Sequence, residues 1–114
     1  MDKFEKQLVI QEFEKHLNKE YGGFRKEVIF NSIMNTKRQY KADYFLPEYN
    51  IIIEINGGQW TGGRHTRAGN VKGKNYTQYE NDLNKLNLAQ YHGYAIYQFT
   101  YEQILRMEYK EYLR

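Results

Sequence analysis

Apolar residues follow helical spacing in some stretches and strand spacing in others, and the pattern predicts the order of the elements. Residues 2–20 have apolar side chains at helical spacing, and Gly22-Gly23 is a typical end for such a helix. Residues 26–33 alternate imperfectly but hold four apolar side chains, so we expect a first strand there. The predicted apolar face of the helix consists of Phe4, Leu8, Val9, Phe13, His16 and Leu17.

Two further strands are predicted at residues 41–46 and 50–56, and Pro47-Glu48-Tyr49 between them is short enough for an antiparallel hairpin. Residues 57–73 contain six glycines and form the longest predicted loop. A helix over 75–91, with Thr77 and Glu80 as a capping box, a strand over 94–99 and a last helix opened by Thr100 and Gln103 complete the chain. The buried face of that last helix is predicted as Tyr101, Leu105, Tyr109 and Tyr112.

The predicted order α-β-β-β-α-β-α indicates one α/β domain over residues 1–114. The helix between the third and fourth strands allows a crossover, so we expect a mixed β-sheet of about four strands flanked by helices. The absence of cysteine excludes disulfides and thiolate metal sites. No apolar run approaches the roughly 20 residues of a membrane span, and the first 16 residues do not have the pattern of a secretory signal. We therefore expect no membrane partner and a cytoplasmic location.

Two acidic residues interrupt the predicted hairpin and are candidates for a metal site. Asp43 lies inside the first strand, and Glu54 follows the run Ile51-Ile52-Ile53, where a buried carboxylate is costly without a partner. Asp43, Glu54 and the backbone carbonyl of Ile55 together form a hard oxygen set suited to Mg²⁺ or Mn²⁺. Such an ion lowers the pKa of a bound water and offsets charge on a phosphate, which predicts phosphodiester hydrolysis.

Four segments in this order resemble the PD-(D/E)XK, or restriction-endonuclease-like, nuclease superfamily. They are KADYF at 41–45, EINGG at 54–58, GRH at 63–65 and DLNK at 82–85. Within the superfamily, the closer resemblance is to small phage and prophage nucleases near the VRR-NUC and very-short-patch-repair groups. The resemblance implies a restriction-endonuclease-like core, a metal-dependent deoxyribonuclease, a role in DNA repair or recombination and, for a phage protein, a location in the bacterial host cell.

The sequence departs from the superfamily motif at Asn56, where the family has a lysine. An amide can orient a water but supplies no positive charge. The resemblance makes Lys85, on the following helix, the natural substitute, and His65 is the second candidate, as general acid or as a contact to the leaving oxygen.

The glycine-rich loop carries four cations and no acid between residues 63 and 74, although the formal net charge of the chain is only +3. We predict that these cations contact the phosphate backbone of a nucleic acid and recognise its shape rather than its sequence. Trp60 can stack on a base or wedge into a junction. The cations are Arg64, Arg67, Lys72 and Lys74.

The function predicted is a Mg²⁺- or Mn²⁺-dependent endonuclease that cuts branched, flap, nicked or mismatched DNA, and a homodimer would supply a site for each strand. A catalytically silent nucleic-acid-binding protein of the same fold is the alternative, since the motif lysine is absent. A weaker third option is an interaction protein that does not touch nucleic acid.

Each candidate residue also has an ordinary structural explanation. Asp43 can be an edge-strand surface acid, Glu54 can pair with a buried lysine or arginine, and Lys85 can be a solvated helix lysine paired with Asp82. His65 and the basic loop can be mere surface features, and Trp60 can cover the core. Glu5 or Glu12 of the first helix can add a further acid to the site, although exposure to solvent is the simpler expectation.

Overall fold

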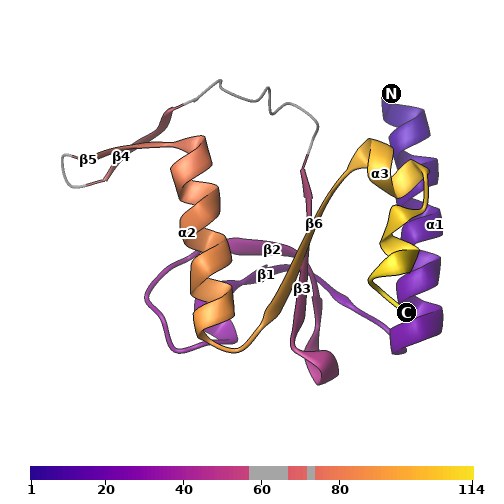
Figure 1. Cartoon of the computed structure of the whole chain (residues 1–114), viewed down its shortest axis with the longest axis horizontal. Helices are drawn as coiled ribbons and strands as arrows, with labels where there is room; N and C mark the ends of the chain where they lie inside the picture. The colour runs from indigo at the N-terminus through magenta and orange to yellow at the C-terminus, as the bar shows by residue number, and fades with distance from the viewer. Residues whose placement is uncertain (57–66, 72–73) are drawn as a thin grey trace.

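A computed structural model of the chain describes residues 1–56, 67–71 and 74–114, with the side chains of 56, 67–71 and 74–78 excepted (Figure 1). The described helices are α1 (Lys3–Tyr21), α2 (Gln78–Tyr91) and α3 (Tyr101–Leu105). The described strands are β1 (Arg25–Ile29), β2 (Lys41–Leu46), β3 (Ile51–Asn56), β4 (Arg67–Val71), β5 (Lys74–Thr77) and β6 (Ala95–Thr100). Short 3₁₀ segments cover Phe30–Ser32, Pro47–Tyr49 and Glu108–Glu111.

The central sheet is mixed and has the strand order β1-β2-β3-β6. β1 pairs antiparallel with β2, and β2 with β3, whereas β3 and β6 run parallel. The segment that contains α2 supplies the crossover that a parallel pair requires. The sequence prediction of a four-stranded mixed α/β sheet is therefore confirmed, and β2 and β3, which carry Asp43 and Glu54, are its two inner strands.

Helices cover both faces of the sheet, and each covered face has its own apolar cluster. Figure 1 shows α2 on one side of the sheet and α1 with α3 on the other. Phe13 and Leu17 of α1 pack with Tyr44 and Ile53 on the α1 side. Ala89 of α2 packs with the opposite face, which includes Ala42, Phe45 and Ile52. The site residues on β2 and β3 thus lie between two packed layers.

Local sequence fixes the ends of α1 and α3. Asp2 and Glu5 form a capping box at the start of α1, and Gly22 ends it in the left-handed conformation at φ 75°. The capping box predicted for Thr100 and Gln103 is confirmed at the start of α3. These caps fix where both helices begin, which matters for α3 because it follows directly from β6.

Several predicted boundaries are wrong. The first strand ends at Ile29, and the next residues form a 3₁₀ turn. Residues 67–71 and 74–77 pair as the antiparallel hairpin β4–β5, where a loop and a helix start were predicted, and α2 begins at Gln78. The alternation of residues 67–77 is too weak to reveal strands, because glycine and polar residues dominate it. The Thr77 side chain, and with it the predicted capping box, is outside the described residues.

Two predicted apolar faces are also partly wrong. Phe4 and Leu8 of α1 are exposed, as are Leu105 and Tyr112 near the C-terminus. The buried positions after β6 are Ile104, Tyr109 and Leu113. α3 stops after five residues and Met107 follows at φ 58°, so one helical period does not run through this segment.

Of the helices in the described ranges, none has the length and apolar character needed to cross a membrane.

Candidate active site

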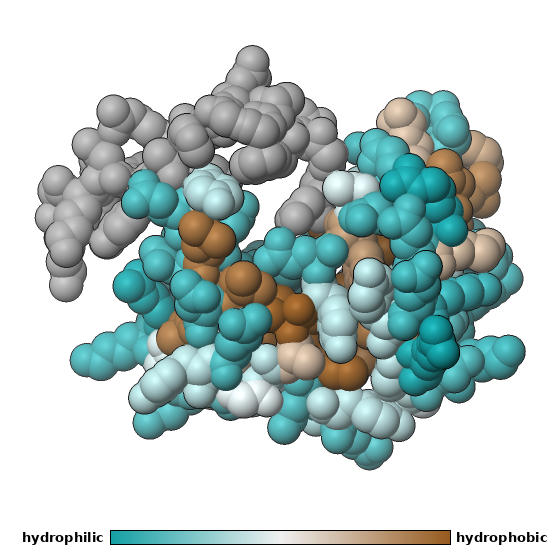
Figure 2. All heavy atoms as spheres, viewed as in Figure 1, coloured by the Kyte–Doolittle hydropathy of each residue, from teal (hydrophilic) through white to brown (hydrophobic). Residues whose placement is uncertain are grey.

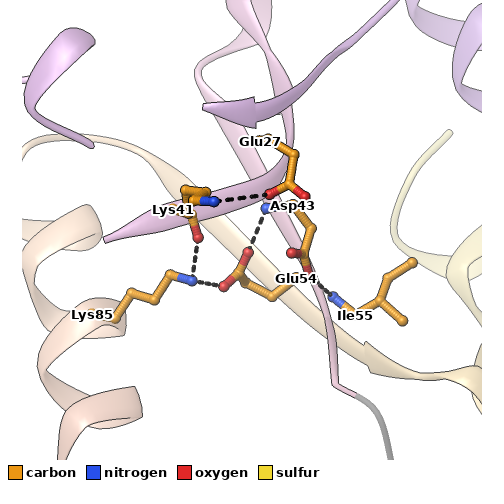
Figure 3. A network of polar contacts seen from close by, with 6 residues as sticks. All are labelled: Glu27, Lys41, Asp43, Glu54, Ile55 and Lys85. Carbon is orange, nitrogen blue, oxygen red and sulfur yellow. Dashed lines mark hydrogen bonds and ion pairs between the residues drawn. The ribbon is translucent and has the colours of Figure 1, made fainter. Parts of the chain in front are cut away.

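Side chains replace the regular ladder where β2 and β3 diverge. The last backbone pair of these strands is Tyr44 with Ile53. Next to it, the Asp43 amide donates to Glu54 Oε2 at 2.8 Å, and the Ile55 amide donates to Asp43 Oδ2 at 2.8 Å (Figure 3). Each carboxylate therefore bonds to the backbone of the other strand, and such charge-assisted bonds are stronger than neutral ones. This reciprocal pair brings the two predicted acids together.

A change of face in β1 and β2 explains why Asp43 bonds across the ladder. Residues two apart on a regular strand share a face, yet Ala42 packs on the α2 side and Tyr44 on the α1 side. In β1, Lys26 pairs with a glutamate of α1 whereas Val28 packs on the α2 side. Glu27 lies between them at φ 55°, a conformation that is uncommon for residues other than glycine. The irregular position opposite Glu27 is Asp43.

Tyr44 ties this irregular segment to α1. Its hydroxyl donates to Glu14 Oε2 at 2.7 Å, and Lys26 Nζ lies 3.0 Å from the same oxygen. Burial, reinforced by the hydrogen bond and the charge of Glu14, raises the pKa of Tyr44. The phenol therefore stays protonated and keeps donating to Glu14 at neutral pH.

Lys85 of α2 reaches the acid pair from the other side. Its Nζ donates to Glu54 Oε1 and to the Lys41 carbonyl oxygen, and it lies 5.8 Å from the centroid of the Phe30 ring. The Lys85 side chain is 17% exposed and that of Glu54 9%, so the ion pair is largely shielded from water. Burial lowers the pKa of Lys85, while the charges of Asp43 and Glu27 act in the opposite direction.

A cavity of about 280 Å³ lies beside Asp43, on the side of α1 and α3. We call it the Asp43 cavity, and its walls include Ile10, Lys26, Glu27, Ile55 and Tyr101 as well as Asp43 itself. Glu54, in contrast, turns toward Lys85 of α2 (Figure 3). The acid pair thus lies between the Asp43 cavity on one side and the buried ammonium of Lys85 on the other.

The structure brings four of the predicted site residues together: Asp43, Glu54, Ile55 and Lys85. For the others it describes at most the backbone, so their predicted roles fall outside the described residues. Trp60, Arg64, His65 and Lys72 belong to the ranges 57–66 and 72–73, and the side chains of Asn56, Arg67 and Lys74 are likewise not described.

The structure contradicts the ordinary explanation for Asp43 and confirms the one for Glu54. β2 is an inner strand, so Asp43 is not an edge-strand acid. Glu54 does pair with a buried lysine, and Lys85 is not a solvated helix residue. Neither Glu5 nor Glu12 adds an acid to this cluster, since Glu5 caps α1 and Glu12 is exposed beside Lys15.

Glu27, the Lys41 carbonyl and Tyr101 are parts of this region that sequence reasoning missed. Glu27 lies in the Asp43 cavity and 3.9 Å from Lys41 Nζ, and Tyr101 forms a cavity wall. Tyr101 was assigned to the core by its helical spacing. Glu27 gave no signal, because a positive φ leaves no mark on a hydrophobic pattern.

The oxygen donors at this site are of the type that a hard cation prefers, but they are few. In the described ranges, no three or more histidine, aspartate or glutamate side chains are grouped so that they could hold a metal ion. The carboxylates of Asp43 and Glu54 and the Ile55 carbonyl are oxygen donors of the class that Mg²⁺ and Mn²⁺ prefer. Both carboxylates already accept hydrogen bonds, so they are oriented and hold their charge in place.

Comparisons of the chain with protein-family models, with curated proteins and with solved structures find no match.

Proposed function

We propose that this protein is a metal-dependent endonuclease of the restriction-endonuclease-like type that hydrolyses phosphodiester bonds in DNA. The observation that carries the proposal is the meeting of Asp43, Glu54 and Lys85 where β2 and β3 diverge. Two carboxylates and a lysine drawn from three elements suit phosphodiester hydrolysis, because the acids can hold a cation and the lysine can face developing negative charge.

Asp43, Glu54 and the Ile55 carbonyl would hold Mg²⁺ or Mn²⁺. When bound, such an ion supplies an activated water and offsets the charge of the phosphate. Lys85 holds the Glu54 carboxylate in position and keeps a positive charge beside it. In the proposal it takes the role of the lysine that Asn56 replaces, and His65 remains the second candidate, as general acid or as a contact to the leaving oxygen.

The experiment is a cleavage assay on a panel of linear duplex, nicked, flap, four-way and single-stranded DNA, with Mg²⁺ or Mn²⁺. Wild-type protein should cut at least one of the nicked, flap or four-way forms. Glu54→Ala should still bind DNA but lose cleavage by at least 100-fold, the scale on which metal-ligand or electrostatic groups act. The matched control is Glu48→Ala, an exposed glutamate at the opposite end of the same hairpin, which should cut normally.

A catalytically silent DNA-binding protein is the second candidate, and one observation favours it. Lys85 donates to Glu54, so an ammonium group lies next to a carboxylate that the nuclease would offer to a metal. Calorimetric titration of the wild type with Mn²⁺ separates the candidates. A nuclease requires a saturable site that Glu54→Ala weakens, whereas DNA binding without Mn²⁺ binding or cleavage would establish the silent protein.

A homodimer is part of the proposal, because cutting two strands takes two sites. Exposed apolar side chains gather over α1 and α3, at the right of Figure 2, where Leu8, Leu105 and Met107 border an apolar hollow of about 180 Å³. With Phe4 they expose on the order of 400 Å² of apolar surface, taking about 200 Å² for each large side chain. That is about half of what one partner buries in a standard interface.

Light scattering after size exclusion tests the dimer directly. The wild type should have twice the mass of one chain at micromolar concentration, and Leu8→Glu should have the mass of one. A wild type that is monomeric at 100 µM would remove the dimer from the proposal.

A further inference from the structure

The Asp43 cavity has walls that the proposed hydrolysis leaves without a role. Of the residues that line the cavity, Asp43 is the one whose side chain takes part in the proposed reaction. Ile10 of α1 and Ile55 of β3 contribute apolar walls, and Tyr101, the first residue of α3, contributes an aromatic one. An apolar and aromatic wall is the composition of a site for a flat ring. Lys26 also lines the cavity and can attract an anionic group attached to that ring, which the carboxylates of Asp43 and Glu27 repel.

Tyr101 is held in place as a wall of this cavity. Its backbone is fixed by the capping box of Thr100 and Gln103, whose two hydrogen bonds measure 2.9 and 3.1 Å. The Nζ of Lys6, on α1, lies 4.8 Å from the centroid of the Tyr101 ring. An ammonium at that distance attracts the ring and also places a positive charge beside this aromatic wall.

The size of the cavity limits what can enter it. At about 280 Å³ it is at the lower end of sites for small molecules, so it has room for one nucleotide but not for a base pair. A paired base would have to leave its stack first, which costs a few kcal/mol, whereas an unpaired base enters without that cost. Bases of any sequence stack on tyrosine, so such a site would select structure rather than sequence.

We propose that the Asp43 cavity binds one unpaired nucleotide of the DNA strand, next to the bond that is cut. The base contacts the Tyr101 ring, and Lys6 offsets the charge of the neighbouring phosphate. This role rests on the proposed function and narrows it to single strands, flaps and other DNA that offers an unpaired nucleotide beside the scissile bond.

The test measures binding apart from cleavage. A short single-stranded oligonucleotide that contains the fluorescent base 2-aminopurine is titrated with protein at low salt, without divalent ions. Wild-type protein should change the fluorescence saturably. Tyr101→Ala should weaken binding about 5- to 150-fold, the range of one base–aromatic stack, and Tyr101→Phe should stay within about twofold of the wild type.

Two further variants guard against a simple folding defect. Ile10→Trp fills the cavity from α1 without altering Tyr101 and should weaken binding to a similar extent. Tyr91→Ala removes an exposed tyrosine at the end of α2 and should bind like the wild type. Circular dichroism and thermal melts identify any variant that is unfolded.

The outcomes separate this site from the proposed nuclease. If Tyr101→Ala and Ile10→Trp are folded and bind like the wild type, the cavity is not a nucleotide site, whatever the cleavage assay shows. If both lose binding while the wild type cuts no DNA with either metal, the nucleotide site stands and the nuclease does not. Equal binding and cutting of intact duplex and flap DNA would also overturn the role of the cavity.

Discussion

Replacing Lys85 by methionine should destabilise the protein by about 2–4 kcal/mol. The substitution keeps an unbranched stem but removes the ammonium that donates to Glu54 and to the Lys41 carbonyl. Removing one partner of a buried ion pair costs about 3–5 kcal/mol. We place the value lower because the Lys85 side chain retains 17% exposure and Glu54 keeps its bond from the Asp43 amide. The loss is a large part of the roughly 5–15 kcal/mol that stabilises a typical domain.

Urea unfolding followed by circular dichroism measures the change. Lys19→Met, which removes an exposed lysine of α1, is the matched control and should stay within about 0.5 kcal/mol of the wild type. In the Lys85→Met background, Glu54→Gln should cost less stability than it does in the wild type, because an amide can still accept from the Asp43 amide. The coupling free energy between the two substitutions should be at least about 1 kcal/mol. Lys85→Met within 0.5 kcal/mol of the wild type, or strict additivity, would refute the ion pair.

The same variant reports on the cation site. If Lys85 and a divalent ion compete for Glu54, Mg²⁺ should raise the melting temperature of Lys85→Met by more than that of the wild type. An equal response of the two proteins would mean that the ion, where it binds, does not meet Lys85.

Three further predictions concern the framework around the site. Because the pKa of Tyr44 is raised, the folded protein keeps a proton that the unfolded chain releases near pH 10. The contribution of Tyr44 to stability is therefore full below about pH 10 and falls above it. The free energy of unfolding, measured from about pH 9 to 11.5, should depend less on pH in Tyr44→Phe than in the wild type. Thr100→Ala should cost about 1 kcal/mol by removing the α3 cap, and Thr100→Ser should restore most of it, as measured by urea unfolding. Phe13→Ala should cost about 3–5 kcal/mol because the ring is fully buried, whereas Tyr91→Ala, at a position 83% exposed, should cost under about 0.5; thermal melts of both check this.

The hairpin that carries the acids could be predicted because its signals are local. β2 and β3 can be placed from the isoleucine run, the short turn at Pro47–Tyr49 and one acid on each strand. The approach of Lys85 could not be predicted from spacing, because Lys85 lies 31 residues beyond Glu54 in sequence. Resemblance to a known superfamily suggested Lys85, and the structure places it beside Glu54.

The direction of the Asp43 side chain was out of reach of the sequence. Strict alternation would put Ala42 and Tyr44 on one face, yet they belong to opposite apolar clusters. The change of face depends on the backbone of Glu27, whose positive φ has no compositional signature. Met107 similarly ends the helical period after α3, which is why Leu105 and Tyr112 were wrongly assigned to the core.

The parallel pairing of β3 with β6 requires a crossover, and the helix α2 in that crossover carries Lys85. This arrangement has a consequence for how the site assembles during folding. Asp43 and Glu54 are 11 residues apart and can meet as soon as the hairpin closes, because a short loop closes quickly. Lys85 lies 31 residues beyond Glu54 and reaches it only with α2, which precedes β6 in the chain. A nascent chain whose first 60 residues have left the ribosome can therefore form the acid pair, while its cationic partner is still inside the exit tunnel.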